Sequence, residues 1–241
     1  MSLDDLALLG FGAEGWGGAL LRAALATVLV SVCAFLLGLA LGTLLAWAKL
    51  AGGAVVRRAA DVYSVVLRGI PDLLVIYLFY FGGRQVMAAL ARLAGYEGPV
   101  DISGFVAGAL AIGLISAAGQ AEVLRGAYGA IPGGTFEAGL AGGMGRWTLF
   151  RRVIVPQGTV TALPGLGNQW QSVIKESALV SVTGLVETMR AVTIASGSTD
   201  LPFLFYAAGA VIFLAITSLS GLVFRAAEGR VRRWAPSMGR A

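Results

Sequence analysis

The stretch Leu20–Ala48 constrains the fold of this chain more than any other, because Arg22 is its single charged residue. About 20 consecutive apolar residues let a helix cross the hydrocarbon core of a membrane, where only helices and closed barrels satisfy their backbone groups. Three further segments of suitable length follow, at Val62–Gly82, Ser103–Ala121 and Leu204–Phe224. The pattern predicts an all-α integral membrane protein.

A weaker apolar segment at Thr159–Val182 contains Lys175 and Glu176. We count it as a span, which gives five transmembrane helices. Charged residues and a proline also interrupt the second span: Arg68, Pro71 and Asp72. The composition fits a membrane protein, because 13% of the residues are charged, against about 25% in soluble domains.

Basic residues are distributed unevenly between the two sides of the predicted membrane domain. Twelve of the 18 follow the first, third and fifth spans: Lys49, Arg57, Arg58, Arg125, Arg146, Arg151, Arg152, Arg225, Arg230, Arg232, Arg233 and Arg240. The opposite side holds Arg22, Arg84, Arg92 and Arg190. Because Lys and Arg concentrate in cytoplasmic loops, we expect the N-terminus outside and the C-terminus in the cytoplasm. That arrangement needs an odd number of spans.

The absence of histidine and the single cysteine, Cys33, exclude several kinds of chemistry. Histidine-based triads, histidine-ligated metals, zinc clusters and internal disulfides are not available, so we expect no metal site. The net charge of +5 is explained by cytoplasmic loops rather than by nucleic-acid binding. Residues 1–18 contain Asp4, Asp5 and Glu14 but no basic residue, so no cleavable signal peptide is expected.

Two local patterns concern helix packing and the membrane surface. The pairs Gly38/Gly42 and Gly104/Gly108 have the spacing of small residues at close helix–helix contacts, and ordinary bundle packing explains them. The stretch Gln85–Ala94 predicts a short amphipathic helix on the outer membrane surface.

The loop Ala130–Gln157 is too polar to span and too long for a simple connection. Thr135 is expected to cap a helix that carries Glu137 near its positive end. Gly142 and Gly143 then break this helix, and residues 146–152 form a second amphipathic turn with Trp147 and Phe150. Two short helices joined by a glycine elbow predict a projection that docks into a partner protein.

This loop resembles the EAA loop of bacterial ABC-importer permeases, whose pattern is E-A-A, three residues, G, nine residues, then I-x-L-P. The matching positions are Glu137, Ala138, Gly139, Gly143, Val153, Val155 and Pro156. Gly139 replaces the second alanine, and two valines replace isoleucine and leucine. The flanking segments Arg68–Leu74, Glu122–Pro132 and Leu163–Leu185 are similar to the polar-amino-acid subfamily, and within it to the histidine/lysine-arginine-ornithine and opine permeases.

The resemblance implies a single permease domain over residues 1–241 with the five-helix fold of type I ABC importers, in the bacterial inner membrane. It implies a transporter subunit, not an enzyme, that forms the path for a polar, basic amino acid or an opine. The implied ATPase-docking residues are Glu137, Ala138, Gly139, Gly143 and Pro156. The implied partners are a dimer of ATP-binding cassette subunits, a second permease subunit (a paralogue rather than an identical chain) and an extracytoplasmic binding protein. ATP and Mg²⁺ would be bound by the cassette subunits, which agrees with the lack of a G-x-x-x-x-G-K-[ST] loop here.

Polar residues in the fourth predicted span are candidates for the substrate path. Asn168, Gln171 and Lys175 share one helical face, and Ser172 and Glu176 form a neighbouring stripe. Because ionisable groups in a bilayer cost about 2.5–3.5 kcal/mol on insertion scales, they face a cavity or a partner. We therefore expect Asn168, Gln171, Lys175 and Glu176 to line the path; equally open is that Lys175 and Glu176 are interfacial or paired structurally.

Other charged or helix-breaking residues have structural interpretations. Pro164, Gly165 and Gly167 could unwind the fourth span, as in discontinuous transporter helices. Arg68 and Asp72 are expected to form an ion pair that holds a kink at Pro71. Gln120 and Glu122 would close the third helix, as a cap or as a gate.

Three other classes of protein are alternatives. A secondary transporter or channel would explain the spans but gives the Ala130–Gln157 loop no purpose. A membrane enzyme lacks a visible nucleophile–base constellation, and a purely structural protein does not account for charges within spans. Which amino acid or opine is carried stays open.

Overall fold

The computed structural model describes residues 3–12, 14–96, 98 and 102–234, and all regular structure in them is helical. In chain order the elements are α1 (Leu3–Ala7), α2 (Gly17–Ala51), α3 (Ala54–Gly69), α4 (Asp72–Tyr77), the π-helical turn η1 (Leu78–Gly82), α5 (Gly83–Leu93), α6 (Gly104–Gly129), α7 (Gly133–Ala141), α8 (Arg146–Leu149), the π-helical turn η2 (Phe150–Ile154), α9 (Val155–Ser177), the 3₁₀ turn η3 (Ala178–Thr183), α10 (Thr188–Thr199) and α11 (Pro202–Trp234). Arg240, one of the basic residues counted above, lies outside the described residues.

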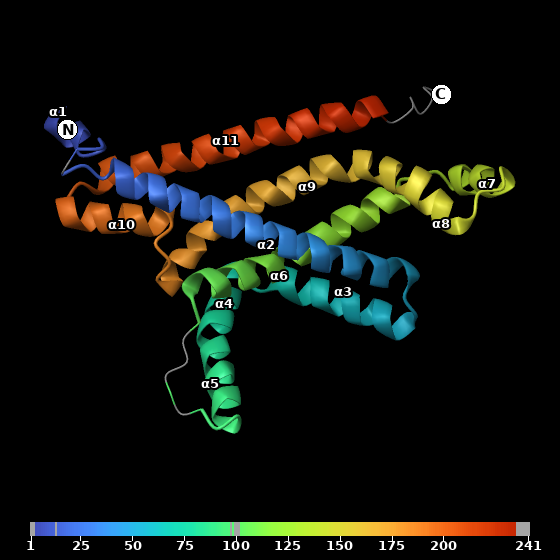
Figure 1. Ribbon diagram of the computed structural model, residues 1–241, viewed down its shortest axis with the longest axis horizontal. Helices are drawn as coiled ribbons and strands as arrows, with labels where there is room; N and C mark the ends of the chain where they lie inside the picture. The colour runs from blue at the N-terminus through green and yellow to red at the C-terminus, as the bar shows by residue number, and fades with distance from the viewer. Residues whose placement is uncertain (1–2, 13, 97, 99–101, 235–241) are drawn as a thin grey trace.

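The long helices α2, α6, α9 and α11 run along one axis and form an elongated bundle (Figure 1). Helices α7 and α8 lie at one end, called here the α7 end, and α10 lies at the other, the α10 end. The chain runs toward the α7 end in α2, α6 and α11 and away from it in α9. Helices α1 and the last turns of α11 therefore lie at opposite ends, as an odd number of crossings requires.

Within the described residues, four helices are long and apolar enough to span a membrane: Gly17–Ala51, Asp72–Leu93, Gly104–Gly129 and Pro202–Arg233. A fifth span is possible if Arg146–Thr183 and Thr188–Thr199 together count as one bent crossing, with an angle of 54° between them. The first, third and fifth predicted spans are thus confirmed, although α6 and α11 continue well beyond their predicted ends.

The second span was predicted ten residues too early. Pro71 cannot donate a backbone hydrogen bond, and it forces the preceding residue out of helical conformation; Ile70 is extended, with ψ of 138°. The chain therefore turns between α3 and α4. From Asp72 the helix continues without a break through η1 into α5, so the predicted helix Gln85–Ala94 is the last part of this arm rather than a separate element.

The fourth span also differs from the prediction. Helix α8 runs through η2 directly into α9, and α9 is not unwound at Pro164. Gly165 and Gly167 instead let neighbours approach, since added side chains there would meet Val123 and Phe224. The turn that does break the crossing is at Gly184, which has a positive φ of 86° and separates η3 from α10.

Close helix packing explains the paired glycines. A Cβ on Gly38 or Gly42 would lie 3.0 Å from a carbonyl oxygen of α6, at Gly113 and Ala117 respectively. Gly104 lies against Thr183 and Gly108 against Val180. The predicted packing role is therefore confirmed for both pairs, and the α2–α6 contact forms the centre of the bundle.

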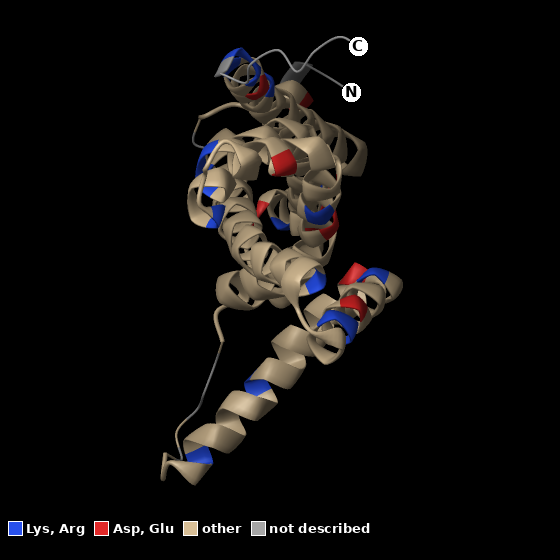
Figure 2. Cartoon of the chain, turned by 90° about the vertical axis from the view of Figure 1, so that its right-hand side faces the viewer, with Lys and Arg blue, Asp and Glu red and all other residues tan. Residues whose placement is uncertain are grey.

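Most apolar side chains of α2, α3, α5 and α11 point outward, for example Leu25, Leu44, Val65, Leu90 and Leu214. Because large exposed apolar surfaces do not persist in water, these faces suit lipid or other membrane subunits. Figure 2 looks onto the α7 end and shows positions of basic residues, in blue, on separate groups of helices around it, while the α4–α5 arm extends away from the bundle.

Candidate functional site

A polar cavity of about 400 Å³ lies between α3, α4, α6 and α9. Its lining consists of Leu67 and Arg68 from α3, Asp72 from α4, Ile115, Ser116, Gly119, Glu122 and Val123 from α6, and Gln169, Ser172 and Glu176 from α9. Three carboxylates and one guanidinium thus face a single space inside an otherwise apolar bundle.

Two of these carboxylates come from different helices and line the same cavity, Asp72 at the start of α4 and Glu176 near the end of α9. Asp72 is partly buried where α4 begins, and Oε2 of Glu176 is buried without a hydrogen-bond partner among the described residues. The expected ion pair between Arg68 and Asp72 is not found among the described residues, although both line the cavity. Two acids without cations at bonding distance suit a cationic ligand.

The four predicted path residues of α9 do not share one surface. Glu176 lines the cavity, whereas Lys175 lines a separate apolar pocket of about 330 Å³ with Met189, Tyr206 and Phe213. Nε2 of Gln171 donates to the carbonyl oxygen of Thr217 on α11, at 3.4 Å. Asn168 is exposed on the outside of α9.

The cavity-facing stripe of α9 consists of Gln169, Ser172 and Glu176. These residues follow the three- and four-residue spacing of a helical face, one position away from the face of Asn168, Gln171 and Lys175. Sequence spacing identified the latter face and the Ser172–Glu176 stripe, but it did not include Gln169. It did not indicate which one α3 and α6 would cover.

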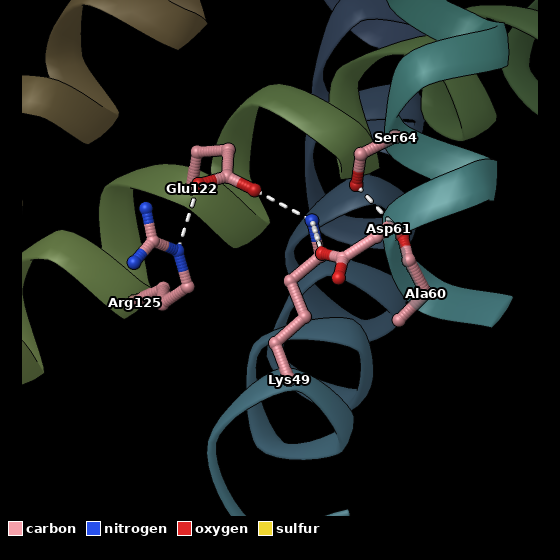
Figure 3. A network of polar contacts seen from close by, with 6 residues as sticks. All are labelled: Lys49, Ala60, Asp61, Ser64, Glu122 and Arg125. Carbon is pink, nitrogen blue, oxygen red and sulfur yellow. Dashed lines mark hydrogen bonds and ion pairs between the residues drawn. The ribbon is translucent and has the colours of Figure 1, made fainter. Parts of the chain in front are cut away.

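At the α7 side of the cavity, Glu122 belongs to a network of ion pairs (Figure 3). Nζ of Lys49 lies 2.6 Å from Oε1 of Glu122 and 3.2 Å from Oδ1 of Asp61. Nε of Arg125 donates to Oε2 of Glu122 at 2.8 Å. The network therefore joins α2, α3 and α6.

Gln120 and Glu122 do not close the third helix, as the sequence had suggested, because α6 continues to Gly129. Gln120 is fully buried, and its Nε2 donates to Oγ of Ser116 at 2.7 Å and to the carbonyl oxygen of Phe35 at 3.3 Å. Its role is to join α6 to α2, while Glu122 faces both the cavity and Lys49.

The loop between α6 and α9 forms the predicted pair of short helices. Helix α7 begins after Pro132, so Thr135 lies inside the helix and is not its cap. Gly143 has a φ of 77° and follows the helix end, and the amide of Met144 donates to the carbonyl oxygen of Gly139 at 3.0 Å. This is the hydrogen-bonding pattern of a glycine-terminated helix. The predicted glycine elbow is therefore confirmed.

The residues matched to the docking motif lie differently in this loop. Glu137, Ala138, Gly143 and Pro156 are exposed, whereas Gly139 packs against Leu149, which is buried at the contact with Ile131 and Ile154. A Cβ at Gly139 would meet Cδ1 of Leu149, so an alanine there would require the end of this leucine side chain to shift. The rings of Trp147 and Phe150 stack beside this surface, with centroids 5.9 Å apart.

Comparison with known proteins agrees with this architecture. The sequence pattern of the family described as "binding-protein-dependent transport system inner membrane component" matches residues 34–233. The chain is 53% identical to an octopine transport system permease protein of Rhizobium meliloti, over 95% of this chain and 96% of the relative. It is 35% identical to the histidine/lysine/arginine/ornithine transport system permease protein of Escherichia coli, over 90% and 94% of the two chains.

Among solved structures, an amino acid ABC transporter crystallised with histidines matches with a TM-score of 0.78 and 28% identity, over 95% of this chain and 100% of that one. The MetNI methionine ABC transporter matches in fold, with a TM-score of 0.68 at 18% identity, over 96% and 99%. The family match and the relatives cover nearly all of the helices described above. The chain therefore belongs to the family of binding-protein-dependent transport system inner membrane components.

Proposed function

We propose that this chain is the membrane-spanning permease subunit of an ATP-driven importer for an amino acid or opine that carries a cationic group. The polar cavity is the observation that carries the proposal. Asp72 and Glu176 offer negative charge to an ammonium or guanidinium group, and Arg68 offers positive charge to a carboxylate. Opposite charges inside one cavity match a substrate that is itself a zwitterion with an additional cation.

The names of the relatives support this substrate class. They include octopine and nopaline transport system permeases and an arginine ABC transporter permease, besides the histidine/lysine/arginine/ornithine system. Lysine, arginine and ornithine carry cationic side chains at neutral pH. The substrate path stays a prediction for Asn168, Gln171, Lys175 and Glu176. Glu176 lies in the cavity, and the other three would meet the substrate only along another part of the route.

ATP hydrolysis is assigned to a partner, a dimer of ATP-binding cassette subunits that binds ATP and Mg²⁺. The exposed surface around Glu137, Ala138, Gly143 and Pro156, with Gly139 beneath it, supports docking on that dimer at the α7 end. The α7 end then lies in the cytoplasm and the α10 end faces an extracytoplasmic binding protein, in a bacterial inner membrane. A second permease subunit, a paralogue rather than an identical chain, completes the path.

Direct substrate binding to the permease complex tests the cavity. We would purify the complex in nanodiscs without the binding protein and measure equilibrium binding of radiolabelled L-arginine. Asp72→Asn and Glu176→Gln are each expected to weaken binding tenfold or more, about 1.4 kcal/mol, because each removes a charge from the cavity.

Asp200→Asn is the matched control, because Asp200 is exposed at the end of α10 and asparagine tolerates its positive φ of 56°. Stimulation of ATPase activity by the loaded binding protein reports whether each variant still assembles. Unchanged arginine binding by both cavity variants, in complexes that retain this stimulation, would rule out the cavity as the substrate site.

A further inference from the structure

Lys49 is the most deeply buried charged side chain of the ion-pair network, with 4% of its side chain exposed. It extends from the last turn of α2 between α3 and α6, where Figure 3 shows its Nζ pointing at both Asp61 and Glu122. The other members are more accessible: the side chains of Asp61, Glu122 and Arg125 are 56%, 27% and 50% exposed. Lys49 is therefore held by its two acidic partners rather than by water.

The network lies directly beside the polar cavity and shares Glu122 with it. Along α6 the lining extends from Ile115 to Val123, so Glu122 is at its α7 side, about 10 Å along the helix axis from Ile115. On α3 the lining contains Leu67 and Arg68, whereas Asp61 lies nearly two turns closer to the α7 end. Lys49 thus lies behind the cavity wall and reaches the cavity only through Glu122.

The charges of the network balance. Lys49 and Arg125 are positive, and Asp61 and Glu122 are negative, so the four side chains together carry no net charge. Without Lys49, Glu122 would keep only the half-exposed Arg125, whose charge water screens more strongly. One additional negative charge would then act on any ligand in the cavity, because interactions are strong where little water separates the charges.

We propose that Lys49 is a positioning residue for substrate selection: it neutralises Glu122 in the cavity wall, so that Asp72 and Glu176 are the acids that a substrate meets. This inference rests on the proposed role of the cavity. Its consequence concerns carboxylates. A cavity with neutralised Glu122 accepts substrates with an additional carboxylate, and a cavity with free Glu122 rejects them.

Two probes that differ by one carboxylate measure this effect: L-arginine and octopine, which is arginine bearing a further carboxyethyl group. The measured quantity is the ratio of the Kd for octopine to the Kd for arginine, in nanodisc complexes without binding protein. Lys49→Met keeps the aliphatic stem and removes the charge, and it is expected to raise this ratio at least fivefold. Glu122→Gln is expected to shift the ratio in the opposite direction, because Lys49, Arg125 and Asp61 then leave a net charge of +1 beside the cavity.

Three further variants separate selection from stability. Lys49→Arg, which keeps the charge, and Arg58→Met, at an exposed position on α3, are expected to leave the ratio within twofold of the parent. The double variant Lys49→Met/Glu122→Gln removes both charges of the pair and is expected to return the ratio toward the parent value. The double variant also replaces Lys49→Met in the binding assay if Lys49→Met alone does not assemble, since it leaves no unpaired carboxylate at Glu122.

The outcomes are distinct. The inference is supported if the ratio shifts in opposite directions for Lys49→Met and Glu122→Gln and recovers in the double variant. If Lys49→Met does not assemble, the shift for Glu122→Gln and the recovery in the double variant support the same conclusion. A ratio that stays constant while both affinities fall together assigns Lys49 a structural role only and overturns it. If Asp72→Asn and Glu176→Gln do not affect arginine binding in the same assay, the proposed function of the cavity fails first, and the inference fails with it.

Discussion

Two glycines of the docking loop are constrained in different ways. Gly139 has an ordinary helical conformation, and the end of the Leu149 side chain occupies the space that an added Cβ would need. Gly143 has room, since nothing lies within 4 Å of an added Cβ, but its φ of 77° disfavours other residues. The docking role that the family resemblance implies for Gly143 therefore has an alternative explanation within the chain itself.

Substitutions at Gly143 separate these explanations. Asparagine tolerates positive φ, whereas a β-branched residue there is strained by about 1–3 kcal/mol. If conformation is what matters, Gly143→Asn retains copurification of the ATP-binding subunit and Gly143→Val loses it. Equal loss with both residues would show that the partner needs the space itself. Gly134→Val, at an open position of α7 with ordinary φ, controls for added bulk.

At the scale of single residues, the spacing of polar residues predicted which of them share a helical face, but not which other helices pack against that face. It placed Ser172 and Glu176 on one stripe of α9, and that stripe lines the cavity. It treated Lys49 as one basic loop residue among many, although Lys49 is buried between two carboxylates. One signal was available: Asp61 is the only acidic residue between Glu14 and Asp72. Its pairing with Lys49 depends on the tight turn at Gly52 and Gly53, which spacing alone does not define.

Among the helices, α10 was missed altogether, and its first residues explain how it is held. Glu187 is fully buried before α10, and its carboxylate accepts hydrogen bonds from the amides of Met189 and Arg190, both at 2.8 Å. Oγ1 of Thr27 on α2 lies 2.8 Å from the hydroxyl of Thr188 and accepts from its amide at 3.0 Å. A polar contact thus fixes α10 against α2 at the break of the fourth crossing.

Removal of this cap is expected to loosen α10 selectively. Glu187→Ala frees two amides of the first turn and should cost about 1–2 kcal/mol of local stability. Hydrogen–deuterium exchange measures the effect: peptides covering Thr188–Thr199 should exchange roughly tenfold faster, while α6 peptides keep the parent rate. Glu228→Ala on α11 is the control. If exchange in α10 is unaffected, the cap does not hold this helix.

Local chemistry accounts for which helices could be predicted. Long apolar runs with at most one charged residue identified α2, α6 and α11, because a helix satisfies its own backbone groups in lipid. Pro71 gave the position of a break, but the sequence interpretation began the span before it instead of after it. Helix α10 is short and polar, with Arg190 and several serines and threonines. Its helical state depends on the buried cap at Glu187, and the pattern of apolar residues along the sequence does not indicate such a cap.

For the whole molecule, the all-α fold is confirmed in the described residues, with four helices long enough to cross and the predicted fifth crossing present if the bent pair on either side of Gly184 counts as one span. Its orientation in the membrane stays a prediction from the basic loops. The α7 end carries the basic residues in the last turns of α2 and α11 and in α8 and η2, so we expect this end in the cytoplasm.

Cysteine labelling tests the orientation, with Cys33→Ala removing the native thiol. Gly197→Cys lies on the exposed surface of α10 and Ala141→Cys on the exposed end of α7. In intact cells a membrane-impermeant maleimide should label Gly197→Cys and not Ala141→Cys, and inverted vesicles should give the reverse. Labelling of Ala141→Cys in intact cells would contradict the assigned direction.

The energy source distinguishes an ATP-driven permease from a secondary transporter. The most direct measurement is uptake of labelled L-arginine into proteoliposomes that contain the permease subunits and the ATP-binding subunits, with binding protein outside. We predict uptake only with Mg-ATP inside, loss of uptake with Glu137→Lys in the docking loop, and no uptake driven by an imposed ion gradient without ATP. Arginine accumulation driven by the ion gradient alone, with or without Glu137→Lys, would contradict the account.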